Sequence, residues 1–248
     1  MLRALFYRRP QTIEPIAIVH EDATYLVRVK RHRQARRYTL RLVTATREVM
    51  LTMPPRGSLR EAKAFAEKNS AWIAARVRHL PETAPFRDGE CVPVRGVMHR
   101  ICHCPNKRGT VWTDVLDGKN VVYVAGEAPH LHRRLLDFLK REARRDLDVA
   151  SRRYAAALDV KIGSISVRDQ VSRWGSCSSA GALSFSWRLI LAPSYVLDYL
   201  AAHEVAHLVE MNHSRKFWRI LISHCPDIDR AKEWLDAHGA SLHRYGAQ

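Results

Sequence analysis

Apolar and polar residues alternate with a period of two in several short stretches of the first half of the chain. Alternation of this kind, bounded by turn residues, predicts short β-strands with one buried face. The alternation is clearest in residues 38–43 and 48–53. Further short strand-like stretches are residues 24–29, 91–94, 97–102, 110–115 and 120–124. The break at 44–47 and the Asp117-Gly118 pair predict two hairpin turns between neighbouring strands.

Two longer stretches carry apolar residues three or four positions apart, and this spacing predicts helices over 59–80 and 129–158. Ser58 and Glu61 form a capping-box pattern at the start of the first helix. Pro129 opens the second helix, at a position where the missing N–H of proline costs nothing. The second helix marks a change in the chain from strands to helices.

After the second helix, a hairpin of 173–181 and 182–190 precedes a third helix that begins at Pro193-Ser194. The order of elements therefore predicts an α+β protein with a β-rich, basic N-terminal lobe. In the second lobe, we expect a small sheet to pack on the third helix. The expected lobes are residues 1–126 and residues 127–248.

The third helix carries His203, Glu204 and His207 in the pattern H-E-x-x-H. Residues four positions apart share one face of a helix, so His203 and His207 can bind one metal ion together. Glu204 lies beside that ion without binding it, where a general base can take a proton from metal-bound water. Burying these groups without a partner would be costly, so we predict a Zn²⁺ site.

The third metal ligand must come from beyond the helix, because three side chains of one straight helix cannot surround a tetrahedral ion. Asn212 can end the helix in a left-handed conformation, which lets His213 fold back to the metal. Ser214 is a typical N-cap for the helix that follows. Glu210 lies too far along the helix, and Glu233 would require a ligand from a later helix, so we favour His213 over both.

Charge is the second strong feature of the chain, with a formal net charge of +16. Residues 1–126 hold 23 Lys and Arg against 11 Asp and Glu, and residues 127–248 hold 18 against 14. The formal charges are therefore +12 and +4, and the densest basic run is 28–37. A run of this kind can neutralise phosphates or attract an acidic protein, so nucleic acid and acidic proteins are candidate partners of the N-terminal lobe.

Other function classes are disfavoured by composition. The sequence contains no run of 18 apolar residues, so we expect no membrane-spanning helix. The apolar part of the first ten residues is too short, and the segment too basic, for a secretory signal. Five cysteines without a framework spacing are typical of reduced thiols, so we expect a cytoplasmic protein. Cys102-His103-Cys104 fits a strand better than a metal site, because His103 would point away from both thiols.

A second electrophile besides the metal is needed to stabilise negative charge on the substrate oxygen. The candidates near the metal helix in sequence are Arg188, Arg173, Tyr195 and His224. For Arg188 and Arg173, a structural contact that supports the hairpin is an equally good interpretation. The edge of that hairpin offers unpaired N–H and C=O groups, to which an extended peptide can add as a further strand.

Four segments of the chain together resemble the YgjP-like metallopeptidase family, and they are residues 173–177, 187–193, 203–208 and 212–218. The front half is similar to that family in its basic stretch, in Tyr38–Arg41 and in Ala71–Ile73. The resemblance implies a zincin-like metallopeptidase lobe that hydrolyses peptide bonds. It also implies His203, His207 and His213 as zinc ligands and Glu204 as the catalytic base.

The histidine spacing is also similar to that of SprT-like and WLM proteases, some of which act on proteins attached to DNA. Peptide or protein is accordingly the expected substrate. The alternative interpretation is a nucleic-acid-binding or partner-binding protein with a structural or dormant zinc site. Structural zinc sites are usually closed and rich in thiolates, which favours the enzyme.

Overall fold

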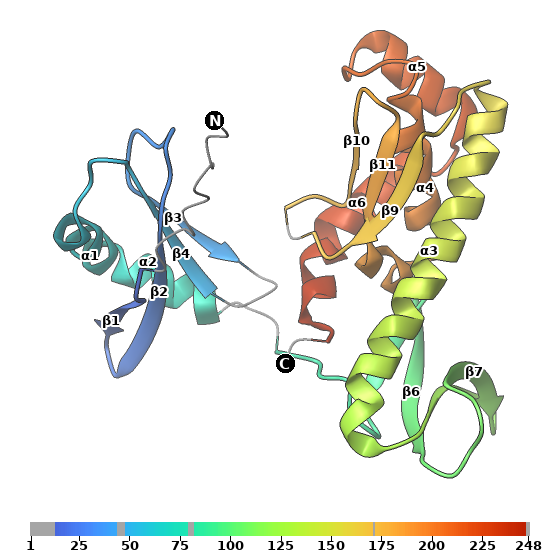
Figure 1. The fold of residues 1–248 in the computed structure, drawn as a ribbon, viewed down its shortest axis with the longest axis horizontal. Helices are drawn as coiled ribbons and strands as arrows, with labels where there is room; N and C mark the ends of the chain where they lie inside the picture. Colours follow the sequence, from blue (N-terminus) through green and yellow to red (C-terminus); the bar gives the residue numbers. More distant parts are fainter. Residues whose placement is uncertain (1–12, 44–47, 79–81, 171, 247–248) are drawn as a thin grey trace, which may run out of the picture. The chain divides into compact units, whose positions relative to one another are not determined.

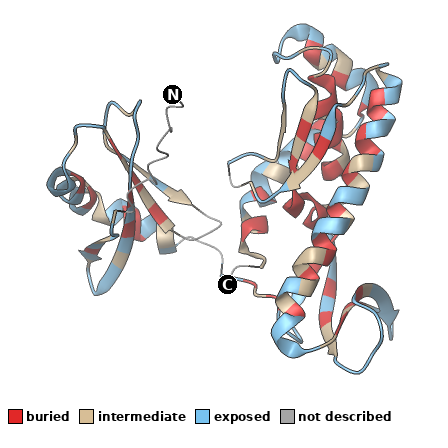
Figure 2. Ribbon diagram, viewed as in Figure 1, coloured by how far each residue is buried: buried red, intermediate tan, exposed pale blue. Residues whose placement is uncertain are grey.

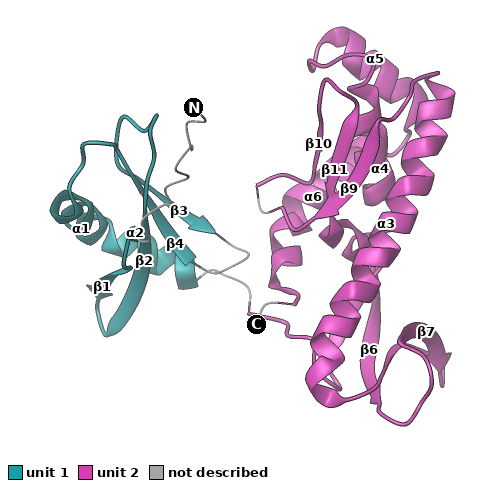
Figure 3. Ribbon diagram, in the orientation of Figure 1, with its two compact units in different colours: residues 1–80 teal, residues 81–248 magenta. Residues whose placement is uncertain are grey.

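The chain forms two compact units in the computed structural model, residues 1–80 and residues 81–248 (Figure 3). The structure describes residues 13–43, 48–78, 82–170 and 172–246. Helices and several small mixed sheets make up both units, as expected of an α+β protein. Each unit has its own hydrophobic core.

The first unit is built on a four-stranded sheet in the order β1-β2-β4-β3 (Figure 1). Its strands are β1 (Ile16–His20), β2 (Ala23–Arg31), β3 (Thr39–Val43) and β4 (Glu48–Met53). Strands β2 and β4 run parallel, whereas the other two pairs are antiparallel. The turn predicted at 44–47 lies outside the described residues, but Val43 pairs with Glu48 across it, as in a hairpin.

Two helices, α1 (Leu59–Lys68) and α2 (Ser70–Arg78), cover one face of this sheet. The predicted capping box is present, because Ser58 accepts a hydrogen bond from the backbone N–H of Glu61 and Glu61 accepts one from the N–H of Ser58. The sequence predicted one helix here, but the helix is interrupted at Asn69. The side chain of Asn69 donates to the carbonyl of Phe65 and so competes with the helical backbone bonds.

The second unit begins with another four-stranded sheet, in the order β5-β6-β8-β7. Its strands are β5 (Cys91–Val94), β6 (Val97–Cys104), β7 (Val111–Leu116) and β8 (Lys119–Ala125). The short helix η1 (Ala128–His130) leads into the long helix α3 (Leu131–Ala157), which shows a buried stripe along its length (Figure 2). That stripe packs partly on this sheet and partly on residues 187–206 later in the same unit, and all of them contribute to one core.

The division between the compact units differs from the predicted lobe boundary at 126/127. That boundary separates β8 from α3, yet Val122 and Val124 of β8 belong to the same buried cluster as Leu135 and Leu139 of α3. A change from strands to helices is therefore not a change of core. The compact units divide at Leu80/Pro81 instead.

A three-stranded sheet follows α3, in the order β10-β11-β9. Its strands are β9 (Ser164–Arg168), β10 (Gly175–Cys177) and β11 (Ala182–Ser186). The hairpin predicted before the third helix is present, because β10 and β11 are antiparallel. The second predicted strand is shorter than expected, since 187–191 form the 3₁₀ helix η2 (Trp187–Leu191).

The chain ends in a group of helices around the buried α4 (Ser194–Ala206). They are α5 (Arg215–His224), α6 (Ile228–His238) and the 3₁₀ helix η3 (Gly239–Arg244). Helix α4 is apolar on nearly all sides, as expected of a helix at the centre of a core. No helix within the described part of the chain is long and apolar enough to cross a membrane.

Candidate metal centre

The carboxyl end of α4 carries the two histidines of the H-E-x-x-H pattern. His203 and Glu204 lie in its last turn, and His207 is its C-cap residue with helical backbone angles. The helix ends at Ala206, earlier than the prediction that Asn212 ends it. The chain turns at this point, and the N–H groups of Val209 and Glu210 both donate to the carbonyl of Ala206.

His213 returns to this end of the helix, so that three imidazoles lie together. One nitrogen from each of His203, His207 and His213 lies within 4.8 Å of the others. The Nε2 atoms of His203 and His213 are 3.0 Å apart. His207 is buried, His203 is half-buried and His213 is exposed, so the cluster has one side open to solvent.

The start of α5 fixes the position of His213. Ser214 is the N-cap of that helix, as predicted, and its side chain accepts from the N–H of Phe217. The fully buried ring of Phe217 contacts all three histidines, with centroids 4.6 Å from His207, 4.8 Å from His213 and 5.0 Å from His203. Phe217 therefore packs α5 against the end of α4.

Protonation in the cluster favours metal binding. Burial, and then the neighbouring imidazoles, lower the pKa of His203 to about 4. Burial likewise lowers the pKa of His207. At neutral pH these two rings are therefore uncharged, which is the form that binds a metal. The Nε2 atoms of His203 and His213 face each other, and a bound cation can accept a lone pair from both.

The ring of His207 is oriented by the backbone. Its Nδ1 donates to the carbonyl oxygen of Glu210 at 3.2 Å, and such a bond leaves Nε2 as the metal-binding atom. The carboxylates of Asp198, Asp227 and Asp229 lie on nearby elements and could in principle take this kind of role. Asp198 instead accepts hydrogen bonds from Tyr154 and Arg153.

Glu204 is buried beside the cluster, with 5 % of its surface exposed. Burial raises the pKa of this carboxyl to about 7, and the charge of Arg173 acts in the opposite direction. Gly175 of β10 lies directly against it, because a Cβ at that position would be 2.7 Å from Cγ and 2.8 Å from Cδ of Glu204. Strand β10 therefore passes next to the candidate base.

Two of the four candidate substrate contacts, Arg173 and Tyr195, lie in different surroundings. Arg173 is exposed and close enough for its charge to act on Glu204. Tyr195 lies two helical turns before His203, and the guanidinium of Arg230 covers its ring at 3.9 Å. Only Arg173 of this pair is thus placed beside the buried carboxyl.

Arg188 is committed to structural contacts. Its side chain is buried and pairs with Asp169 through Nε at 3.0 Å, while Nη1 donates to the carbonyls of Leu242 and Tyr245. Four contacts of this kind occupy most of its five N–H donors. Of the two interpretations of Arg188, these bonds support the structural one.

The competing ligands are not part of the cluster. Within the described ranges, the group of side chains able to share one ion at this place consists of the three histidines. Glu210 directs its carboxylate towards Lys216 at 3.9 Å. Cys177 of β10 is also unsuited to nucleophilic chemistry, because burial and then the charge of Glu204 raise the pKa of its thiol to about 11.

Two residues that lie near the three histidines were not predicted from the sequence. Tyr199 lies edge-on to the ring of His203 at 5.8 Å, and it precedes His203 by four residues on α4. A separation of four residues places two side chains on the same face of a helix, so this contact could have been predicted from the sequence. Lys232 of α6 acts on His203 through its charge, but 29 residues separate the two and no local pattern connects them.

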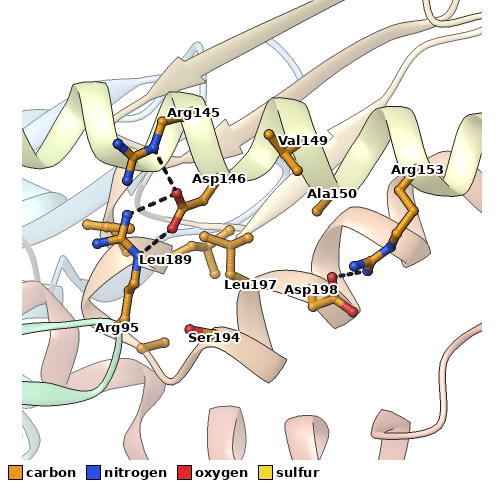
Figure 4. Close-up of a pocket in the computed structure, with 12 residues that line it drawn as sticks. Arg95, Arg145, Asp146, Val149, Ala150, Arg153, Leu189, Ser194, Leu197 and Asp198 are labelled. Carbon is orange, nitrogen blue, oxygen red and sulfur yellow. Dashed lines mark hydrogen bonds and ion pairs between the residues drawn. The ribbon is translucent and has the colours of Figure 1, made fainter.

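A cavity of about 260 Å³ lies apart from the histidines, between α3, η2 and the start of α4 (Figure 4). Its floor is apolar, and its charged groups pair with one another. Arg95 and Arg145 pair with Asp146 at one end, and Arg153 pairs with Asp198 at the other. None of the three clustered histidines lines it, so we do not assign it to the metal centre.

Comparison with known proteins finds one matching family and one similar solved structure. The structure is that of the metallopeptidase zymogen of Pyrococcus abyssi abylysin, which shares 22 % identity over 40 % of this chain and 97 % of its own, with a TM-score of 0.34. No curated protein sequence matches the chain. A model of the YgjP-like metallopeptidase domain matches residues 37–238, which is most of the chain. The chain therefore belongs to the YgjP-like metallopeptidase family.

Proposed function

We propose that this protein is a zinc-dependent peptidase in which His203, His207 and His213 hold the metal and Glu204 is the general base. The observation that carries the proposal is the cluster of three imidazoles with a buried carboxyl beside it, in a chain of a metallopeptidase family. Peptide or protein is the substrate class that such a family implies.

The donor set fits zinc in an open, catalytic site. Three neutral imidazoles are typical ligands for Zn²⁺ and leave one of its four positions for water or substrate. When bound there, the metal lowers the pKa of water and polarises a carbonyl group. The exposed edge at His213 gives a substrate a route to this place.

Glu204 moves the proton in the proposed reaction. Its carboxylate accepts a proton from the attacking water and then passes it to the amine that leaves. A base works best when its pKa lies near the working pH, and burial raises the pKa of Glu204 to about 7. The carboxyl of Glu204 can therefore both accept a proton from water and release it to the leaving amine near neutral pH.

Strand β10 supplies the surface for an extended substrate. It is the edge strand of its sheet, paired with β11 on one side only, and Gly175 brings its backbone against Glu204. Unpaired backbone groups at such an edge can bind a peptide by strand addition. Arg173, just before this strand, is the candidate to stabilise negative charge on the substrate carbonyl.

The substitution Glu204→Gln tests the role of the base. It removes the proton acceptor and keeps the shape, so we expect zinc content and unfolding temperature to stay near wild type. Cleavage of a mixed peptide library should fall by about a hundredfold or more. Mass spectrometry of the library and metal analysis check both results. A variant that cleaves as fast as the parent would rule out Glu204 as the base.

The choice of third ligand has its own test. We expect His213→Ala to weaken zinc binding about a hundredfold or more, and Glu233→Ala to leave it within twofold, measured by competition with a chelating dye. Glu233 serves as the control because it was the alternative ligand. The opposite pattern would place a distant glutamate on the metal and exclude His213.

A further inference from the structure

The sheet of the first unit has one covered face and one open face. Val27 and Val29 of β2 point into the core beneath α1 and α2. Leu26, Arg28 and Lys30 alternate with them and are exposed, so they lie on the other face. The helices cover only one side, and this open face presents side chains of β1, β2, β3 and β4 to solvent.

The strand register places basic side chains in adjacent rows on the open face. Arg28 of β2 is opposite Met50 of β4, and Met50 is opposite Arg41 of β3. Lys30 lies in the next row, opposite Thr52. Neighbouring strands are about 4.8 Å apart, so Arg28 and Arg41 start about 10 Å from each other.

The connection from β2 to β3 extends this basic region. Arg33, Arg36 and Arg37 are all exposed along it. Arg31, at the end of β2, donates to the carbonyls of Pro55 and Gly57 and so ties the beginning of this connection to the unit. We call Arg28, Lys30, Arg33, Arg36, Arg37 and Arg41 the cationic face.

Most charges of the cationic face are uncompensated. Arg28 pairs with Glu48 at 2.6 Å, but the other five make no ion pair with a carboxylate of the described residues. The second unit differs, since Arg95, Arg153 and Arg188 all face acidic partners. Residues 1–80 hold 17 Lys and Arg against 6 Asp and Glu, a formal charge of +11, while 81–248 hold 24 against 19, or +5.

Repulsion among like charges disfavours such a cluster unless a polyanion binds it. We propose that the cationic face binds single-stranded nucleic acid through its phosphates, independently of the metal centre. Val19 and Leu26 are 67 % and 64 % exposed on the same open face, at the β1 side, and they offer an apolar surface to unstacked bases.

A single strand fits this face better than the groove of a duplex. Four strands span about 14 Å before side chains are counted, which is wider than the major groove of about 12 Å. The face has no aromatic side chain among its described outward positions, so contacts to phosphates rather than base stacking must supply the affinity. Binding should therefore depend strongly on salt and little on sequence.

The test uses the 248-residue chain and a fluorescent 20-nucleotide oligothymidylate, with binding measured by anisotropy from 50 to 300 mM NaCl. The variant Lys30→Gln/Arg37→Gln/Arg41→Gln removes three unpaired charges. We expect its affinity at 50 mM NaCl to fall tenfold or more, and the slope of log K against log salt to fall by about 2, since each phosphate contact contributes about 0.7.

The control variant Arg60→Gln/Lys63→Gln/Lys68→Gln removes the same charge from exposed positions of α1, in the helical layer of the same unit. It should bind within twofold of wild type. Circular dichroism identifies any unfolded variant, and the single substitutions Lys30→Gln and Arg41→Gln then replace the triple one. Each should weaken binding about two- to fivefold.

Three results would overturn the proposal. They are no binding by the wild-type protein at 50 mM NaCl, equal weakening by the control variant, and stronger competition by duplex DNA, polyglutamate or phosphatidylserine vesicles than by oligothymidylate at equal charge. Loss of peptidase activity in Glu204→Gln has no bearing on this outcome, so the two proposals fail separately.

Discussion

Glu204 has room for its carboxyl only because residue 175 has no side chain. A Cβ at Gly175 would lie within 2.8 Å of Glu204 Cδ, closer than packed carbon atoms allow. We therefore predict that Gly175→Ala displaces the base and lowers peptide turnover ten- to a hundredfold, while zinc content stays near one per chain. Steady-state kinetics and metal analysis check this result.

Ser176→Ala is the matched control for that substitution, because it lies next to Gly175 on the same strand and only removes a hydroxyl. Its turnover should stay within threefold of wild type. If Gly175→Ala were as active as Ser176→Ala, the close packing of β10 on the base would have no catalytic importance.

His243 is a buried residue whose ionisation affects stability. Burial, and then the charge of Arg188, lower its pKa to about 4, whereas an exposed histidine titrates near 6.5. Between these values the unfolded chain binds a proton that the folded chain does not. The stability from neutral His243 is therefore present above pH 6.5 and decreases as the pH falls towards 4, by up to about 3 kcal/mol.

The variant His243→Phe keeps an aromatic ring against Trp174, on which His243 stacks at 5.4 Å. We expect its unfolding free energy to fall less than that of wild type between pH 7 and pH 4.5, as measured by urea titration. Parallel pH profiles for the two proteins would show that the pKa of His243 is the same in the folded and the unfolded chain.

Arg188 joins two elements that are distant in sequence, η2 and the carboxyl end of η3. Its guanidinium donates to the carbonyl oxygens of Leu242 and Tyr245 at 3.0 and 2.7 Å. Arg188→Met should therefore cost about 3 kcal/mol of unfolding free energy, since it leaves buried carbonyls without donors. Zinc affinity of the folded variant should stay within threefold of wild type.

Thermal unfolding and zinc competition check both parts of that prediction. Arg152→Met is the control, because Arg152 makes only an exposed contact with Asp148 one turn away and its loss should change the unfolding temperature little. A stable Arg188→Met protein with lost turnover would instead support a direct role in the reaction.

The sequence predicted the starts of helices well, because a helix start depends on residues close to one another in the chain. Ser58 and Ser214 cap the helices they were expected to cap, because a cap is made within three residues. The end of α4 was not predicted, since Asn212 is a suitable terminator but the chain turns at His207. Helical spacing joined His203 and His207 in one hypothesis, the expected turn and the family resemblance added His213, and the three imidazoles lie together in the structure.

Contacts between residues far apart in the chain could not be predicted from the sequence. Arg188 was considered for the site because it lies 15 residues before His203, yet its carbonyl partners are 54 and 57 residues away. Gly175 gave no signal of its own, because its role depends on Glu204 lying against it. The compact units divide at a place other than 126/127 for the same reason, since Val122 and Leu135 share a core across residue 126.

The described residues form two hydrophobic cores, and the candidate metal centre lies in the second unit. Buried clusters of 18–73 and 86–242 belong to the first and second units, and the three histidines belong to the second. Because a ligand stabilises only the part that binds it, removal of zinc should destabilise residues 81–248 and leave residues 1–80 unchanged.

Hydrogen exchange with and without chelator checks this prediction. We expect faster exchange in α4 and α5 after chelation, by tenfold or more, and unchanged exchange in β2 and β4. Magnesium, which prefers oxygen ligands, should not restore protection when added to the chelated protein. Equal loss of protection in both units would mean that they unfold as one.

The central claim is that one zinc ion binds to His203, His207 and His213. The most direct test is an anomalous difference map from crystals of the zinc-loaded protein, collected at the zinc absorption edge. We predict one strong peak about 2.0–2.1 Å from a nitrogen of each histidine, with Glu204 near it but not bound. A peak ligated by Glu210 or Glu233, or no peak among these imidazoles, would contradict the claim.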